Sequence, residues 1–188
     1  MQRKGFTLIE LLIVIGIIAI LATSVVLIIN PVKILAETRD VQRSSDLNTV
    51  KAAINLAVYS VVSGLNFPAG PGCSFTQTAS DPQVFPWGNC SAPTIVDLRK
   101  IDGNGWMKIN LGLNSSIPVL PTDPIQNQNY SYHYKGSGTI NGTFELNGRL
   151  ESVKYRDQMV NDGGNANSCP STYQEQTCWY EVGTSLTL

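Results

Sequence analysis

Apolar residues fill the start of the chain from Phe6 to Ile29, and Glu10 is the only charged side chain among them. As an α-helix this segment would extend about 36 Å, which is enough to cross a membrane hydrocarbon core of about 30 Å. A carboxylate within lipid is unfavourable by roughly 2.5 kcal/mol or more on insertion scales. We therefore treat Glu10 as a candidate functional residue and look for its partner.

The pattern changes after this apolar segment, where Asn30 and Pro31 are expected to kink the helix or to interrupt it for a turn. Farther on, apolar residues recur three or four positions apart, which predicts an amphipathic helix packed on a globular domain. These residues are Leu47, Val50, Ile54, Val58 and Val61. Gly64 ends the periodicity, and the prolines and glycines after it predict a loop.

Charges of both signs occupy the first part of this amphipathic segment. Residues of opposite sign lie three or four positions apart, as in Lys33 with Glu37 and Arg43 with Asp46. The charged set is Lys33, Glu37, Arg39, Asp40, Arg43, Asp46 and Lys51. Two interpretations stay open, a solvated helix surface and a contact with neighbouring subunits.

A period of two, typical of β-strands, occurs in three later segments, 107–111, 130–134 and 144–147. Asn141-Gly142 fits a hairpin turn, and Asn147-Gly148 is either a second turn or a weak point within a strand. Gly, Pro, Asn, Ser and Thr crowd the second half of the chain, which suits an antiparallel β domain with long turns.

The charge balance excludes some partners and indicates a topology. The formal net charge is -1 with 14% charged residues, so no basic face or acidic tail suggests nucleic acid as a partner. Arg3 and Lys4 precede the apolar segment with no acid among the first nine residues, which predicts a cytoplasmic N-terminus and an exported remainder. The apolar segment is longer than the core of a cleaved signal peptide, so we expect an anchor.

All four cysteines follow the apolar segment, and none forms a CxxC pair, which argues against a zinc site. In an exported domain they are expected to form disulfides, for which three pairings are possible. We favour Cys73 with Cys90 and Cys169 with Cys178, because each pair brackets a turn-rich stretch. The alternative is four free thiols in a cytosolic protein.

Residues 4–10, read as KGFTLIE, resemble the cleavage and methylation motif of type IV prepilins and of the pseudopilins of type II secretion. The resemblance implies that a membrane-embedded prepilin peptidase cuts between Gly5 and Phe6 and methylates the new amine of Phe6. Glycine suits such a position, because a residue without a side chain lets the scissile backbone approach closely. Arg3 and Lys4 match the short basic leader of the family.

The same resemblance implies a partner for Glu10. In a filament packed around a helical core, the amine of Phe6 in one subunit can lie beside the Glu10 carboxylate of its neighbour. Opposite charges attract strongly in a low dielectric, but desolvation offsets much of the gain, so the pair sets register more than it adds strength. The alternative is that Glu10 snorkels to the membrane interface from near the helix end.

The predicted fold class is α+β, a type IV pilin-like fold in which a long N-terminal helix packs on a C-terminal antiparallel sheet. Residues 1–5 are the expected cleaved leader and 6–29 the membrane or filament-core helix. Residues 30–64 continue that helix, and 65–188 form the globular domain with disulfide-stapled loops. Two later stretches, 120–124 and 144–151, resemble the proline-aspartate-proline turn and a strand of pseudopilin-like proteins.

The function implied by the resemblance is that of a structural filament subunit, in a type IV pilus or a type II secretion pseudopilus, and not of an enzyme. Its expected partners are prepilin peptidase, identical or homologous pilin subunits and an inner-membrane assembly platform. It is expected to cross the inner membrane once before joining a cell-surface or periplasmic filament. The alternatives are an anchored exported binding module that never polymerises, and an adhesive or DNA-uptake minor pilin.

Other candidate sites are weaker. Some major pseudopilins bind calcium, and oxygen ligands of suitable hardness occur here without the full EF-hand spacing, in residues that tight turns also require. They are Asp102, Asn104, Asp123, Asp162 and Asn165. No other cofactor is expected. His133 is the only histidine and is expected to serve packing or the surface, and no nucleophile–base set is apparent.

Overall fold

A computed structural model describes residues 5–61, 64–76, 87, 90, 92–112, 116–169 and 178–188. Arg3 and Lys4 of the expected leader lie outside these residues. The chain divides into two compact units, Met1–Ala36 and Glu37–Leu188, which are described in turn.

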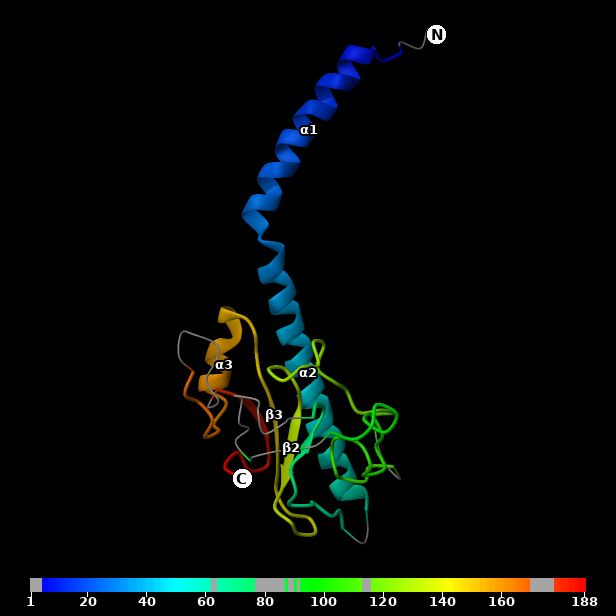
Figure 1. Cartoon of the computed structure of the whole chain (residues 1–188), viewed down its shortest axis with the longest axis vertical. Coiled ribbons are helices and arrows are strands. Elements are labelled where there is room, and N and C mark those ends of the chain that lie inside the picture. Colours follow the sequence, from blue (N-terminus) through cyan, green and yellow to red (C-terminus); the bar gives the residue numbers. More distant parts are fainter. Residues whose placement is uncertain are drawn as a thin grey trace. The chain divides into compact units, whose positions relative to one another are not determined.

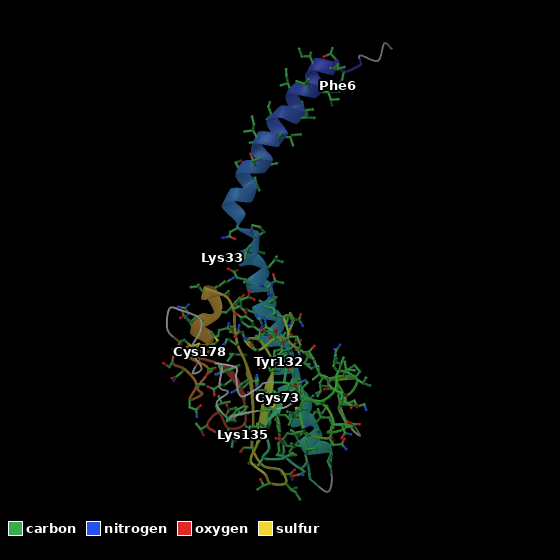
Figure 2. All side chains as sticks on the ribbon, in the orientation of Figure 1. Phe6, Lys33, Cys73, Tyr132, Lys135 and Cys178 are labelled. Carbon is green, nitrogen blue, oxygen red and sulfur yellow. A yellow bond between two sulfur atoms is a disulfide. The ribbon has the colours of Figure 1, made fainter. Side chains whose placement is uncertain are left out.

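The first unit contains helix α1, Leu8–Ile29. Within the described residues, Leu8–Val25 is the one helical segment long and apolar enough to cross a membrane, and none of it is buried in the chain. Its apolar side chains project on all sides of the helix (Figure 2). A helix that is apolar all round requires lipid or other protein around it.

Helix α1 ends at Ile29, its C-cap Asn30 adopts the left-handed conformation with φ 33°, and helix α2 begins at Pro31. The carbonyl oxygen of Asn30 accepts hydrogen bonds from the amides of Lys33 and Ile34, at 3.1 and 3.4 Å. Proline is tolerated at the first helical position, because its missing N–H would have no partner there. Of the two outcomes left open, a kink and an interruption, the structure has the interruption.

The second unit packs α2 across one face of a four-stranded antiparallel sheet in the order β1-β2-β3-β4 (Figure 1). Helix α2 spans Pro31–Ser60, and the strands are β1 (Gly72–Cys73), β2 (His133–Gly136), β3 (Phe144–Gly148) and β4 (Tyr180–Gly183). A 3-10 turn η1 (Val153–Tyr155) and helix α3 (Arg156–Val160) lie between β3 and β4 in the sequence. This arrangement confirms the predicted α+β class.

The predicted apolar stripe of α2 forms the centre of the core. Leu47, Val50 and Ile54 are fully buried and join one cluster with Tyr134 of β2 and with Trp106 of an irregular segment. Gly148 allows a close approach here, since a β-carbon at that position would lie 2.9 Å from Leu47 Cδ1. Asn147 and Gly148 both lie inside β3, so the second of the two interpretations of this dipeptide is correct.

Two sequence predictions of regular structure are wrong in part. Residues 107–111 form no strand. Met107, Ile109 and Leu111 are buried in the core, as a strand pattern would place them. Within the described residues, however, the segment has one β-bridge, between Asp102 and Asn110, instead of a ladder of backbone hydrogen bonds. The helix predicted to reach residue 64 ends at Ser60.

Strand β2 also starts later than the predicted segment. The amide of Tyr132 donates to Ser74 Oγ at 2.8 Å, so a side chain takes the place of a strand partner there. Asn141, with φ 48°, lies in the connection between β2 and β3, as the hairpin prediction requires.

The sheet face opposite α2 is polar and also buried. His133, Glu145, Asn147 and Glu181 are each at most 1% exposed. Part of the cover comes from the last residues of the chain, where the amide of Leu188 donates to Glu145 Oε2 at 3.0 Å. The period-two alternation therefore separates an apolar buried face from a polar buried face.

Candidate functional site

The first helix begins with a reciprocal cap between Thr7 and Glu10. The amide of Glu10 donates to Thr7 Oγ1 at 3.3 Å, and the amide of Thr7 donates to Glu10 Oε2 at 2.8 Å. The hydroxyl of Thr7 donates to the same carboxylate oxygen at 2.8 Å. These bonds satisfy backbone donors that a helix start leaves unpaired, so they order the chain next to the expected cleavage point.

The residues on both sides of that point are accessible. Phe6 is 92% exposed, and no atom lies within 4 Å of the position that a β-carbon on Gly5 would occupy. The peptide bond between them therefore lies before the first turn of α1, which begins at Leu8.

Sequence reasoning identified Glu10 but missed Thr7. The signal was present, because Thr followed by Glu three positions later and then an apolar run is the signature of a capping box. Within the chain the partner of Glu10 is Thr7. Pairing of Glu10 with the amine of Phe6 needs a second subunit and stays a prediction.

The mixed charges of α2 lead to a second feature, a buried ion network around Arg43. Arg43 Nε and Nη2 donate to the two carboxylate oxygens of Asp123 at 2.7 and 3.2 Å, and Nη1 donates to Asp40 at 2.8 Å. Glu151 accepts a further bond from Nη1 at 3.3 Å and one from Arg39 Nε at 2.8 Å. The side chains of Arg43, Asp40 and Asp123 have no exposed area.

Charge pairing outweighs burial in this network. Burial alone would lower the pKa of Arg43, but hydrogen bonds and attraction from Asp123 and then Asp40 raise it. The hydrogen bond from Arg39 lowers the pKa of Glu151. Asp40 and Arg43 belong neither to a solvated helix surface nor to a contact with neighbouring subunits, because they are buried against their own globular unit. The turn at 120–124 brings Asp123 to the helix, so the charges join α2 to the rest of the fold.

A pair of glutamates lies at the centre of the polar sheet face. Glu145 and Glu181 come from adjacent strands, and burial, followed by the neighbouring Glu145, raises the pKa of Glu181 to about 8. Glu181 Oε2 accepts the amide of Ala166 at 2.9 Å, while its buried Oε1 has no hydrogen-bond partner in the described part of the chain. These contacts attach the loop after α3 to the sheet.

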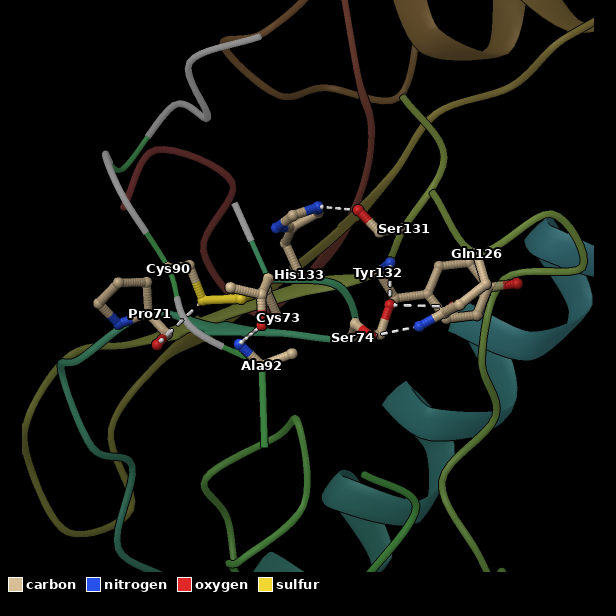
Figure 3. Close-up of a disulfide and its surroundings, with 10 residues drawn as sticks. Pro71, Cys73, Ser74, Cys90, Ala92, Gln126, Ser131, Tyr132 and His133 are labelled. Carbon is tan, nitrogen blue, oxygen red and sulfur yellow. Dashed lines mark hydrogen bonds between the residues drawn. A yellow bond between two sulfur atoms is a disulfide. The ribbon is translucent and has the colours of Figure 1, made fainter. Parts of the chain in front are cut away.

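Two disulfides close the loops of the globular unit, Cys73 with Cys90 and Cys169 with Cys178. They are the pairs favoured from the sequence. Figure 3 shows the first bridge beside His133, whose ring contacts Ser131 Oγ through Nε2 at 2.9 Å. Burial and then Arg149 lower the pKa of His133 well below its ordinary value. The histidine is fully enclosed and serves packing.

The calcium candidates are dispersed among turns and the ion network. Asp102 accepts the amide of Asn104 at 3.0 Å, and Asp123 pairs with Arg43. Both oxygens of Asp162 accept amides, those of Gly164 and Glu181. Across the described ranges no group of three or more His, Cys, Asp or Glu side chains is placed to hold a metal ion. Calcium binding at these residues stays a prediction, which melting with and without chelator tests.

Comparison with known proteins bears on the N-terminal segment alone. The prokaryotic N-terminal methylation motif matches residues 1–26, which include Gly5, Phe6 and Glu10. Neither a curated protein nor a solved structure matches the chain. The motif supports a type IV pilin or pseudopilin precursor, a class that consists of structural subunits.

Proposed function

We propose that this precursor is a structural subunit that assembles into a type IV pilus or a type II secretion pseudopilus through its N-terminal helix. The observation that carries the proposal is the methylation motif at residues 1–26. In the proposed sequence of events, prepilin peptidase cuts between Gly5 and Phe6 on the cytoplasmic side. The same enzyme then methylates the amine of Phe6.

The exposed apolar surface of α1 supports assembly through this helix. Phe6, Leu8 and Ile20 are each more than 70% exposed. Before assembly, the lipid of the inner membrane covers such a surface, and in a filament the helices of neighbouring subunits cover it. Because lipid is as apolar as these side chains, helix packing and polar pairs must favour the filament over the membrane.

Glu10 supplies the polar pair. Its Oε2 accepts both bonds from Thr7, and its Oε1 has no hydrogen-bond partner among the described residues. In our proposal the methylated amine of a neighbour's Phe6 binds Oε1, so the capping box stays intact while the charge is neutralised. Glu10 is the only acid of this apolar helix, and in our proposal it must lie beside the amine of another subunit. Neighbouring helices can therefore pack against one another in few axial registers.

Three variants separate capping from charge pairing. Glu10→Gln removes the charge and keeps a side chain that can cap, Glu10→Ala removes both, and Thr7→Ala removes the threonine hydroxyl while the Glu10 carboxylate remains. We expect normal cleavage in all three. Filaments, counted by electron microscopy of sheared fractions, should be lost in both Glu10 variants and retained with Thr7→Ala. Normal filament yield from Glu10→Gln would refute the pairing role.

The proposed partners follow from this role. They are prepilin peptidase, further copies of this chain or homologous pilins, and an inner-membrane assembly platform. The subunit would wait in the inner membrane with its N-terminus in the cytoplasm, as Arg3 and Lys4 favour. After assembly the globular unit would lie on the outside of a surface or periplasmic filament.

A further inference from the structure

Two buried oxygen atoms without hydrogen-bond donors lie on the polar face of the sheet. They are Asn147 Oδ1 of β3 and Glu181 Oε1 of β4, and neither has a partner in the described part of the chain. Asn147 and Glu181 are directly opposite one another in the β3–β4 register, so their side chains leave the sheet on the same face. A buried acceptor without a donor is unfavourable, and one proton on Glu181 would supply the donor that both atoms lack.

The neighbouring carboxyl group of Glu145 is placed differently. Glu145 Oε1 accepts Asn147 Nδ2 at 3.0 Å and Oε2 accepts the amide of Leu188 at 3.0 Å, so both of its oxygens have donors. Glu181 has one donor, the amide of Ala166, which binds Oε2 at 2.9 Å. Hydrogen bonds from N–H groups favour the charged form of a carboxyl group, and charge on one carboxyl group disfavours charge on its neighbour. The donors therefore place the charge on Glu145 and the proton on Glu181 Oε1.

The electrostatic surroundings agree with this assignment. Burial and then two neighbouring carboxyl groups raise the pKa of Glu181 to about 8. These neighbours are Glu145 and Asp162, and the other charged or titratable groups that face this region are His133, Lys135, Arg149 and Lys51. Lys135 and Arg149 each lie over a tryptophan ring, and burial lowers the pKa of His133, so its ring is uncharged. Among the described residues, no ion pair includes Glu181.

The loop 161–168, orange in Figure 1, is attached to the sheet through Glu181. The amide of Glu181 donates to Asp162 Oδ2 at 2.8 Å, and the carboxyl group of Glu181 accepts the amide of Ala166. A β-carbon at Gly164 would clash with this carboxyl group, so the backbone of the loop lies directly against it. Water therefore cannot reach the carboxyl group from this side unless the loop moves.

We propose that protonation of Glu181 controls opening of the loop 161–168. With the proton on Oε1, Glu181 donates to Asn147 Oδ1, its Oε2 holds the amide of Ala166, and the loop is closed. When the proton passes to water, Glu181 and Asn147 present acceptors to each other, and a second negative charge lies beside Glu145. A buried carboxylate is costly unless it is hydrated or paired, and hydration requires the loop to open. Rising pH thus opens the loop while the sheet stays folded, with or without filament assembly.

The test is amide hydrogen exchange of the full chain in detergent between pH 5 and 9, resolved into fragments by mass spectrometry. Glu181→Gln is the informative variant, because its amide can donate to Asn147 and cannot ionise. Asp157→Asn is the matched control, since it makes the same change from carboxyl to amide at an exposed acid of α3. Fragment 161–168 has the same sequence in all three proteins, so the ratio of its exchange rates at one pH reports opening of the loop.

The expected sign follows from the proton balance. The closed loop keeps a proton on Glu181 that the open loop releases, so opening becomes easier between the ordinary value of 4.5 and about 8. Relative to Glu181→Gln, fragment 161–168 should exchange faster by up to about ten-fold per pH unit up to pH 8 and level off above it. We expect Asp157→Asn to follow the original chain. Segment 144–148 of the core reports unfolding of the whole unit and should be better protected than 161–168 at every pH.

Three results would overturn the proposal. The first is a rate ratio between the original chain and Glu181→Gln that stays constant from pH 6 to 8. The second is equal protection of 161–168 and 144–148, since the loop would then open only by global unfolding. The third is loss of protection at pH 6 on adding a chelator, because a cation and not a proton would then join the two acceptors. If Glu181→Gln fails to fold, an unstructured peptide of sequence 161–168 replaces it as the reference.

Discussion

Arg43 and Asp123, 80 positions apart in the sequence, form a bidentate ion pair in which neither side chain has exposed area. The pair connects α2 to the turn at 120–124, and Asp40 extends it by accepting the amides of Glu151 and Ser152, each at 2.6 Å. A buried ion of this kind adds little net stability, but it is costly to leave without its partner. The network therefore fixes where α2 lies on its domain.

The first prediction concerns Arg43→Met, which leaves Asp40 and Asp123 buried without a counter-charge. We expect the free energy of unfolding to fall by about 3–5 kcal/mol, measured by urea titration of the full chain in detergent with tryptophan fluorescence. The control is Lys100→Ala, which breaks the exposed pair with Asp97 and should leave stability unchanged. Similar effects of the two variants would contradict a structural role for the buried network.

The second prediction is a loss of stability as the pH rises toward 8. Burial raises the pKa of Glu181 from 4.5 to about 8, so between these values the folded state holds a proton that the unfolded state has released. Stability therefore falls with rising pH, by at most about 1.4 kcal/mol per pH unit. Thermal melting across pH 5 to 9 measures the slope.

Glu181→Gln serves as the reference for this slope, because an amide cannot titrate. His133, whose pKa burial lowers, acts in the opposite direction below its ordinary value of 6.5, where the unfolded chain takes up a proton that the folded chain excludes. The difference between the original chain and Glu181→Gln isolates the glutamate. If the melting temperatures of the two proteins changed with pH in the same way between pH 6.5 and 8, the raised pKa of Glu181 would be contradicted.

The third prediction concerns the disulfides, which join cysteines 17 and 9 positions apart in the sequence. Replacing Cys73 and Cys90 together by serine should lower stability by about 3 kcal/mol on the loop-entropy scale, and the second pair by slightly less. Thiol titration of exported, unfolded protein should find no thiols without reductant and four with it. Free thiols in the unreduced protein would contradict the pairing.

The sequence predicts most of the helical part of the fold, because periodicity reports burial directly. Leu47, Val50 and Ile54 recur at helical spacing and are all buried, as expected. The same reasoning fails at 107–111, where alternate burial occurs without a paired strand. Burial pattern alone does not say whether the backbone finds hydrogen-bond partners, which is what makes a strand.

The charged residues show a different limit. Arg43 and Asp40 resemble any pair on an exposed helix, and only the tertiary position of Asp123 makes them a buried network. Thr7, in contrast, could have been found, because the capping box is local and readable from four residues. The sequence therefore allows prediction of the capping box, whose contacts are local. It does not allow prediction of the buried ion network, whose contacts join residues far apart in the sequence.

The proposed precursor role depends most directly on cleavage of the peptide bond between Gly5 and Phe6. The measurement is the intact mass of the protein, purified after co-expression with a prepilin peptidase, with Gly5→Leu as the uncleavable control. We predict a mass that lacks residues 1–5 and gains one methyl group, with the Gly5→Leu chain uncut. A full-length mass for the original chain in the presence of active peptidase would contradict the proposal.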